Sequence, residues 1–133
     1  ERTASKVFPG SGDAMGWHIG DHGFEMTLDA EVPALIGGGL PAWLRDDVGL
    51  DSASVGGWAI HPGGPKVIDT VVQGLELAED AADASREVLR TCGNMSSATL
   101  LHIIDRLHAS EIPTPWVGLA FGPGLAGELV AIR

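Results

Sequence analysis

The segment from Trp58 to Pro65 constrains this chain more than any other, because it joins an apolar run directly to a histidine, prolines and glycines. The run from Val55 to Ile60 is apolar nearly throughout, which is typical of a strand covered on both faces and predicts a central place in a sheet. Pro65 suits the first turn of a helix. The segment therefore predicts a strand, a tight turn and a helix, with His61 on the bend.

His61 is a candidate functional residue because an imidazole changes its charge near neutral pH. The glycines that follow it, Gly63 and Gly64, let a ligand or another backbone come close. A lone histidine at a strand end is more often structural, so His61 by itself favours a structural role. Two further loops shift the balance towards function.

The first of these loops is the segment from Cys92 to Ala98, where a glycine, an amide and two hydroxyls precede an apolar run. This pattern predicts a loop that leads into a helix. The second is the segment from Gly118 to Gly124, where a short apolar strand breaks into Gly-Pro-Gly before the chain resumes as a strand. Sharp turns of this kind between strands commonly border a site.

The remaining sequence predicts βα blocks that end in a hairpin. Strands are expected from Glu1 to Phe8 and from Gly23 to Leu28, the latter half-buried with Phe24, Met26 and Leu28 on one face. A helix is expected from Glu31 to Val48, although Gly37 to Gly39 weaken the prediction that it is continuous. A second helix is expected to begin at Pro65, with an apolar inner face of Val67, Ile68, Val71, Val72 and Leu75. A polar helix is expected from Asp80 to Thr91, and a helix apolar enough for the core from Ala98 to Leu107. The fold class is therefore α/β with a mixed sheet.

Composition restricts the organisation and the function. A chain of 133 residues that is 44% hydrophobic supports one core, so residues 1–133 are expected to form one domain. A net charge of −10 with eight Lys and Arg residues argues against nucleic-acid binding. No apolar run is long enough for a membrane span, and no signal peptide is recognised. The single cysteine excludes an internal disulfide, which suits a cytoplasmic protein.

Metal and dinucleotide sites are not expected. His18 and His22 are four residues apart, but Gly16, Gly20 and Gly23 disfavour the helix that would bring both rings to one face. The glycines of the turns do not form the GxGxxG pattern of a dinucleotide fold. His102 and His108 lie in no motif and are expected to be structural or exposed.

Three motifs in order resemble those of the type III polyketide synthases, the chalcone synthase-like family of thiolase-fold condensing enzymes. WAIHPGGPK (58–66) is similar to the family's histidine loop, GNMSSA (93–98) to its asparagine loop, and AFGPG (120–124) to its terminal GFGPG motif. GFEMTLDAEVPALI (23–36) resembles the strand and helix start that precede the histidine loop. The resemblance implies one half of a thiolase-like α-β-α-β-α sandwich with a mixed β-sheet, in which the helix from Ala98 to Leu107 is buried.

The resemblance also implies the reaction and its residues. An acyl-CoA starter and malonyl-CoA would be joined by decarboxylative Claisen condensation in a homodimeric enzyme that needs no cofactor besides these coenzyme A thioesters. His61 and Asn94 would be the catalytic residues, as two donors converging on one thioester oxygen in one cavity. By the same resemblance, substrate would contact Met26, Gly63, Gly64, Lys66, Ser96, Pro123 and Gly124.

The family's cysteine nucleophile is missing, because the resemblance places it in an N-terminal half that this chain does not contain. Cys92 falls where the family has no catalytic residue, and we expect it to be a small buried hydrophobic residue. The chain is therefore expected to be inactive without the N-terminal half of the same enzyme.

The residues of these motifs are more similar to those of bacterial members that extend fatty acyl starters to alkylpyrones or alkylresorcinols than to those of plant chalcone synthases. Two alternatives remain open at this point. One is an enzyme similar to ketoacyl-ACP synthase III, which shares the fold and a Cys-His-Asn site but uses an acyl carrier protein. The other is a non-catalytic half-domain that serves in dimerisation.

Overall fold

A computed structural model describes residues 2–133 and, within them, every side chain except that of Phe24. The main sheet has four strands in the order β1-β6-β5-β4, namely β1 (Arg2–Val7), β6 (Ala126–Ile132), β5 (Trp116–Gly122) and β4 (Gly57–Ile60). A separate two-stranded ribbon consists of β2 (Met15–Gly20) and β3 (Gly23–Leu28). The predicted first strand is confirmed from Arg2 onwards, and Glu1 lies outside the described residues.

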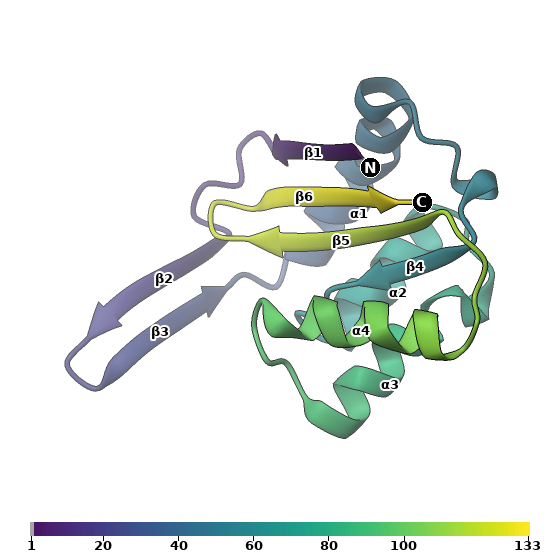
Figure 1. Ribbon diagram of the computed structural model, residues 1–133. Coiled ribbons are helices and arrows are strands. Elements are labelled where there is room, and N and C mark those ends of the chain that lie inside the picture. Colours follow the sequence, from purple (N-terminus) through teal and green to yellow (C-terminus); the bar gives the residue numbers. More distant parts are fainter. Residues whose placement is uncertain (1) are drawn as a thin grey trace.

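The main sheet is mixed, as predicted. β4 runs parallel to β5, whereas β1 with β6 and β5 with β6 are antiparallel. β5 and β6 form the predicted C-terminal hairpin (Figure 1). The α/β fold class with a mixed sheet is therefore confirmed.

The prediction that the strand ending at Ile60 lies centrally is wrong, because β4 is an edge strand. Every residue of β4 is nevertheless buried. Its outer edge is covered by α3 (Asp83–Cys92), where the buried Ser85 hydroxyl accepts a hydrogen bond of 2.9 Å from the Ile60 backbone N–H. An apolar run predicts that a strand is buried. Here helices bury β4 where a neighbouring strand was expected to do so.

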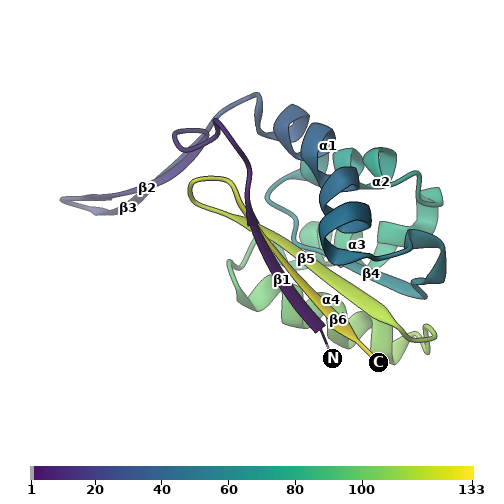
Figure 2. The same ribbon diagram turned by 90° about the horizontal axis from the view of Figure 1, so that it is seen from above.

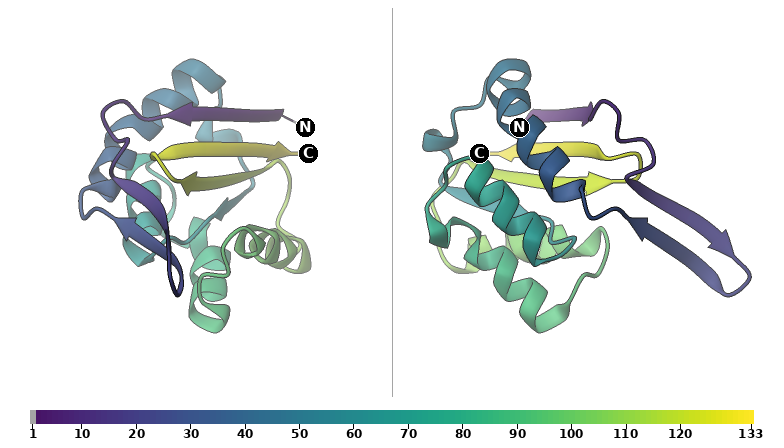
Figure 3. Two further views of the ribbon diagram at one scale, coloured as in Figure 1. Left: turned by 90° about the vertical axis from the view of Figure 1, so that its left-hand side faces the viewer. Right: turned by 180° about the vertical axis from the view of Figure 1, so that it is seen from behind.

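Helices lie on both faces of the sheet (Figures 2 and 3). α1 (Val32–Ala42) and α2 (Pro65–Gly74) pack on one face, in a core that includes Trp58 and Ile60. α3 and α4 (Ala98–Ala109) pack on the other face, in a smaller core that includes Ala59. Short helical turns η1 (Trp43–Val48), η2 (Ser52–Ser54) and η3 (Glu79–Ala82) connect these elements.

Two helix predictions are confirmed in detail. α2 begins at Pro65 and buries Val67, Ile68, Val71 and Val72, the predicted inner face. α1 continues through Gly37 to Gly39 without a break. A Cβ atom on Gly39 would lie 2.6 Å from the Phe8 ring, so this glycine lets the ring of Phe8 pack against the helix.

α4 differs from the prediction of a helix buried in the core. Thr99, Ile103 and Leu107 are buried towards the sheet, but most of the helix is exposed. Leu101 is 69% exposed. The described residues cover one face of α4 only, because no second layer lies over it (Figure 1).

The β2–β3 ribbon projects away from the main sheet (Figures 1 and 2). The strand from Gly23 to Leu28 is confirmed, but its expected half-burial is wrong, since Met26 and Leu28 are 49% and 44% exposed. The expected position of the Phe24 side chain lies outside what is described. The register pairs Trp17 with Met26, which places these two side chains on the same face of the ribbon.

No helix within residues 2–133 is long and apolar enough to cross a membrane.

Candidate active site

The three predicted loops lie at one end of the main sheet. His61 directly follows β4, and the turn from Gly122 to Leu125 joins β5 to β6. Because β4 and β5 are parallel and Ile60 pairs with Leu119, the ends of both strands point the same way. The loop between α3 and α4 reaches this same end, on the left in Figure 1.

His61 is held by its backbone. Its N–H donates to the Leu119 carbonyl at 2.7 Å, and its carbonyl accepts from the Gly63 N–H at 3.1 Å. The side chains of a strand alternate between its faces, so His61 falls on the same face as Ala59, which packs with α3 and α4. The asparagine loop covers this face as well, because Met95 packs against the same cluster.

Burial determines the charge of the His61 ring. The residue is partly buried, and this burial lowers the pKa of its imidazole below the ordinary value. A lowered pKa favours the neutral ring at pH 7, with one N–H donor and one acceptor nitrogen. A neutral imidazole of this kind can donate one hydrogen bond to a substrate oxygen.

Asn94 is exposed on a loop that its own side chain organises. Its Oδ1 accepts a hydrogen bond of 2.9 Å from the Ser96 N–H, and the Met95 N–H donates to the buried Thr99 hydroxyl at 2.7 Å. Ser96 adopts a positive φ of 58° in this turn. Since the oxygen is used within the loop, the Nδ2 amide hydrogens of Asn94 are left as donors.

The Gly-Pro-Gly turn is joined to the base of the ribbon. The Gly124 N–H donates to the Met15 carbonyl at 2.8 Å, and the Ser11 hydroxyl donates to the Gly124 carbonyl at 3.3 Å. Gly124 has a φ of 71°, which favours glycine at this position. The ribbon that carries Met26 therefore starts beside the turn that carries Pro123 and Gly124.

The remaining predicted substrate residues are spread around the same end. Gly63, Gly64 and Lys66 form the turn and the first residues of α2, with the Lys66 side chain exposed. Met26 lies out on the ribbon. Two clefts within residues 2–133, one beside Trp58 and one beside Leu44, are lined by neither His61 nor Asn94. The convergence of these two side chains in one cavity stays a prediction.

Cys92 corrects one expectation. It is exposed at the end of α3, so the prediction of a buried hydrophobic residue is wrong. Its Sγ lies 3.5 Å from the Thr91 hydroxyl. The apolar character of cysteine predicts burial on average, but this position falls on the outer face of an amphipathic helix.

The histidine pair near the N-terminus does not lie on a helix. His18 is in the middle of β2, and His22 is in the turn that follows it. Among residues 2–133, no three His, Cys, Asp or Glu side chains gather as they would around a metal ion.

A cleft of about 660 Å³ lies beside Trp58, at the opposite end of β4 from His61. Its lining comes from residues 52–58, 76–87 and 106–112, and of these only Trp58 belongs to one of the three motifs. No signal in the sequence pointed to it.

Comparison with known protein families shows the family of this chain. A sequence profile described as "Chalcone and stilbene synthases, C-terminal domain" matches residues 1–133. The chain belongs to the chalcone and stilbene synthase family. The match to this C-terminal domain confirms the resemblance to type III polyketide synthases that the three loop motifs carry.

Individual relatives agree with the family match. A 1,3,6,8-tetrahydroxynaphthalene synthase of Streptomyces peucetius subsp. caesius is 38% identical over 138 residues, which cover 98% of this chain and 36% of that protein. A putative chalcone synthase of Bacillus subtilis (strain 168) is 34% identical over 131 residues, with 90% and 34% covered. A type III polyketide synthase of Penicillium soppii is 49% identical over 76 residues, with 57% and 19% covered. The chain spans about a third of the length of the first two relatives.

Proposed function

We propose that this domain supplies the histidine and asparagine of a type III polyketide synthase, which condenses an acyl-CoA starter with malonyl-CoA. The observation that carries the proposal is the gathering of the histidine loop, the asparagine loop and the Gly-Pro-Gly turn at one end of the sheet. The cysteine nucleophile and the rest of the cavity would come from an N-terminal half. The domain alone would then be inactive.

The proposed chemistry divides into three steps. The acyl group of the starter is held as a thioester on the cysteine of the N-terminal half, and coenzyme A leaves. Malonyl-CoA then loses carbon dioxide, and the electron pair of the broken carbon–carbon bond becomes an enolate. The enolate carbon attacks the acyl thioester and forms a tetrahedral intermediate, and this intermediate then collapses to the ketone as the cysteine thiolate departs.

His61 and Asn94 have the residue types that this chemistry requires. Both the enolate and the tetrahedral intermediate place negative charge on a thioester oxygen. The His61 ring N–H and the Asn94 Nδ2 would donate to that oxygen, and one such donor contributes about 3 to 4 kcal/mol of transition-state stabilisation. An imidazolium at His61 would also lower the pKa of a neighbouring thiol.

The finer assignments belong to the same proposal. Met26 would border the acyl cavity, where its flexible thioether accommodates a long starter of the alkylpyrone or alkylresorcinol type. Gly63, Gly64 and Lys66 would lie along the pantetheine arm, and Ser96, Pro123 and Gly124 would shape the cavity. We further propose a homodimer located in the cytoplasm that needs no cofactor. The family match disfavours a carrier-protein-dependent condensing enzyme, because the profile matched is that of chalcone and stilbene synthases.

The test uses the polypeptide that joins this domain to its N-terminal half. We expect Asn94→Asp to lower condensation about 100-fold or more, because an aspartate keeps the acceptor for Ser96 and lacks the Nδ2 donors. His61→Ala should lower it by a similar factor. Polyketide formation from acyl-CoA and malonyl-CoA is measured, with decarboxylation followed separately by radiolabelled malonyl-CoA.

Matched controls separate the site from the fold. Cys92→Ala and His102→Ala should keep near-normal turnover, since both residues are exposed and outside the proposed site. An inactive Cys92→Ala enzyme beside an active His61→Ala enzyme would place the nucleophile in this chain. That result would overturn the proposed division of labour between the two halves.

A further inference from the structure

A cleft of about 660 Å³ lies beside the first half of β4, at the end opposite to His61. Its walls come from the loop before β4, the segment from Glu76 to Glu87, and the end of α4 with the residues that follow it. Small-molecule and peptide sites commonly have volumes of about 300 to 1,000 Å³. The cleft is therefore large enough to hold a ligand or a short peptide segment.

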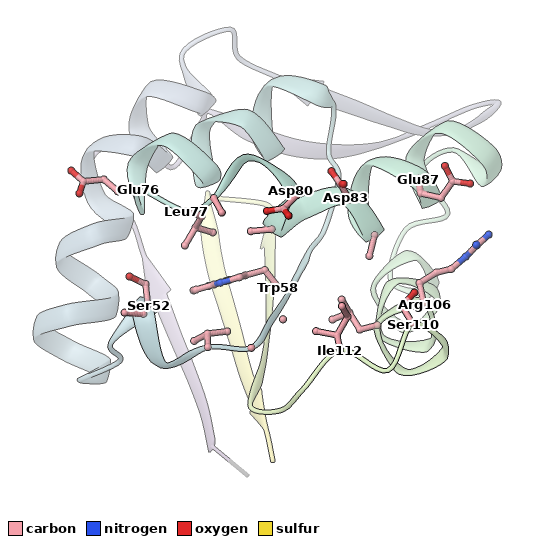
Figure 4. A pocket seen from close by; sticks show the side chains of 18 residues that line it. Ser52, Trp58, Glu76, Leu77, Asp80, Asp83, Glu87, Arg106, Ser110 and Ile112 are labelled. Carbon is pink, nitrogen blue, oxygen red and sulfur yellow. The ribbon is translucent and has the colours of Figure 1, made fainter.

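Trp58 forms the centre of this cleft (Figure 4). Its side chain is almost fully buried, with the residue 3% exposed. Within residues 2–133 its indole N–H has no hydrogen-bond partner, whereas the indole N–H of Trp116 donates to the Ile112 carbonyl at 3.0 Å. No buried side-chain nitrogen or oxygen in the described part of the chain lacks a partner, so the Trp58 indole N–H opens onto the cleft, where a ligand acceptor can take the place of water.

The charges around the cleft are not balanced. Asp83 and Glu87 line it but form ion pairs with Arg86 and Arg90. Glu76 and Asp80 line it without an ion pair within the described part of the chain (Figure 4). The lining as a whole therefore favours a cation.

The rest of the cleft suits an apolar stem. Leu77 and Ile112 lie on opposite sides of the Trp58 ring (Figure 4). Arg106 stands at one end of the cleft, and its guanidinium is turned away from the ring. An occupant that fits all of these groups has a cationic tip, an alkyl stem and a nearby hydrogen-bond acceptor.

We propose that this cleft is a docking site for a peptide segment that carries a lysine or arginine. The cation pairs with Asp80, the alkyl stem packs between Leu77 and Ile112, and a backbone carbonyl of the peptide accepts from the Trp58 indole N–H. A free alkylamine has the cation and the stem but no carbonyl, so the unpartnered donor favours a peptide. The net charge of −10 further favours a basic partner. This site does not depend on the proposed condensation reaction.

The test measures, by fluorescence anisotropy at low salt, the binding of three capped, labelled peptides to the polypeptide that joins this domain to its N-terminal half. They share the sequence Leu-X-Leu, where X is lysine, norleucine or glutamate. The lysine peptide is expected to bind most tightly. Asp80→Asn should weaken its binding about fivefold, through loss of an exposed ion pair, and Trp58→Phe should weaken it by a similar factor.

Glu79→Gln is the matched control for charge, because Glu79 neighbours Asp80 in the sequence and does not line the cleft. It should leave the affinity for the lysine peptide unchanged. If Trp58→Phe unfolds the protein, Asp80→Asn and the norleucine peptide still test the site. Equal effects of Asp80→Asn and Glu79→Gln, equal binding of all three peptides, or no binding at all would overturn the proposal. Displacement of the peptide by butylamine at equal concentration would overturn the choice of a peptide over a free amine.

Discussion

At the scale of single residues, His61 has two proposed roles that need different charge states of its ring, and its burial favours only one of them. Burial favours the neutral ring, which keeps one N–H donor and therefore suits the binding of a thioester oxygen. The imidazolium that would activate a thiol needs an anion close by to offset the same burial. In the proposed enzyme that anion is the cysteine thiolate of the N-terminal half, so the second role is possible only in the longer polypeptide.

The lowered pKa of His61 predicts a pH dependence of stability. The folded state binds a proton at His61 less readily than the unfolded state, whose ordinary value is 6.5. The stability is therefore complete above that value and decreases as the pH falls through it towards the folded pKa. We expect the free energy of unfolding to decrease more for the wild type than for His61→Gln between about pH 8 and about pH 5.5.

Denaturant titrations at the two pH values measure this difference. His102→Gln serves as the control, because this exposed histidine on α4 should leave the decrease equal to that of the wild type. The same decrease in the wild type and in His61→Gln would mean that His61 titrates as it does in water.

At the scale of elements, β4 shows how a short edge strand is protected. Its four residues are buried, and α3 occupies the position beside its outer edge. The Ser85 hydroxyl accepts from the Ile60 N–H, one residue before His61. Ser85 therefore satisfies a backbone donor that a further strand would otherwise satisfy.

Removal of this hydroxyl should destabilise the domain. Ser85→Ala leaves the buried Ile60 N–H without a partner, which costs about 1 to 3 kcal/mol. Ser54→Ala removes a hydroxyl that donates to a backbone carbonyl in an exposed turn, and its cost should stay within about 0.5 kcal/mol. Both values come from chemical denaturation, and equal costs for the two variants would show that Ser85 does not protect the strand edge.

The elements also show what sequence patterns can and cannot predict. The period of the apolar residues predicted the inner face of α2, and the turn residues predicted the loops that carry His61, Asn94 and Pro123. The same patterns failed where they had to identify the covering partner. The sequence predicts β4 in the middle of the sheet and α4 in the core. Both predictions are wrong because an apolar run predicts that a segment is buried but does not identify the element that buries it.

The site was predicted to a similar extent. Local motifs located its loops, but the direction in which the His61 and Asn94 side chains point depends on packing that spans the whole fold. Cys92 illustrates the limit, because its residue type favours burial while its position on α3 leaves it exposed. The cleft beside Trp58 had no local signal, since three separate segments build it.

At the scale of the whole molecule, large apolar side chains stand exposed on α4 and on the ribbon. On α4 this is Leu101, which lies among the exposed polar residues His102, Asp105 and Arg106. On the β2–β3 ribbon, Trp17, Ile19 and Met26 are 47%, 85% and 49% exposed. An uncovered apolar surface such as that of the ribbon marks an interaction site. The chain spans about a third of the length of its first two relatives, and under the proposed function the N-terminal half covers the ribbon.

This arrangement predicts an uneven distribution of stability. The ribbon has two strands and is tied to the body mainly near its base, through the Met15 carbonyl and the Ala14 carbonyl, which accepts from Asp29. A two-stranded ribbon is only marginally stable by itself in water. In the isolated domain, the amides of β2 and β3 should therefore exchange with deuterium at least about 100-fold faster than those of β5 and β6, which lie within the four-stranded sheet.

Hydrogen exchange followed by mass spectrometry measures both regions in one experiment. The same measurement on the polypeptide that includes the N-terminal half should show slower exchange in β2 and β3, with β5 and β6 little changed. The slower exchange depends on the packing of the N-terminal half against the ribbon and not on catalysis, so an inactive His61→Ala enzyme should show the same protection of β2 and β3. If the ribbon of the isolated domain exchanges as slowly as β5 and β6, its stability comes from contacts within this chain, and the apolar face around Met26 has no need of a covering partner.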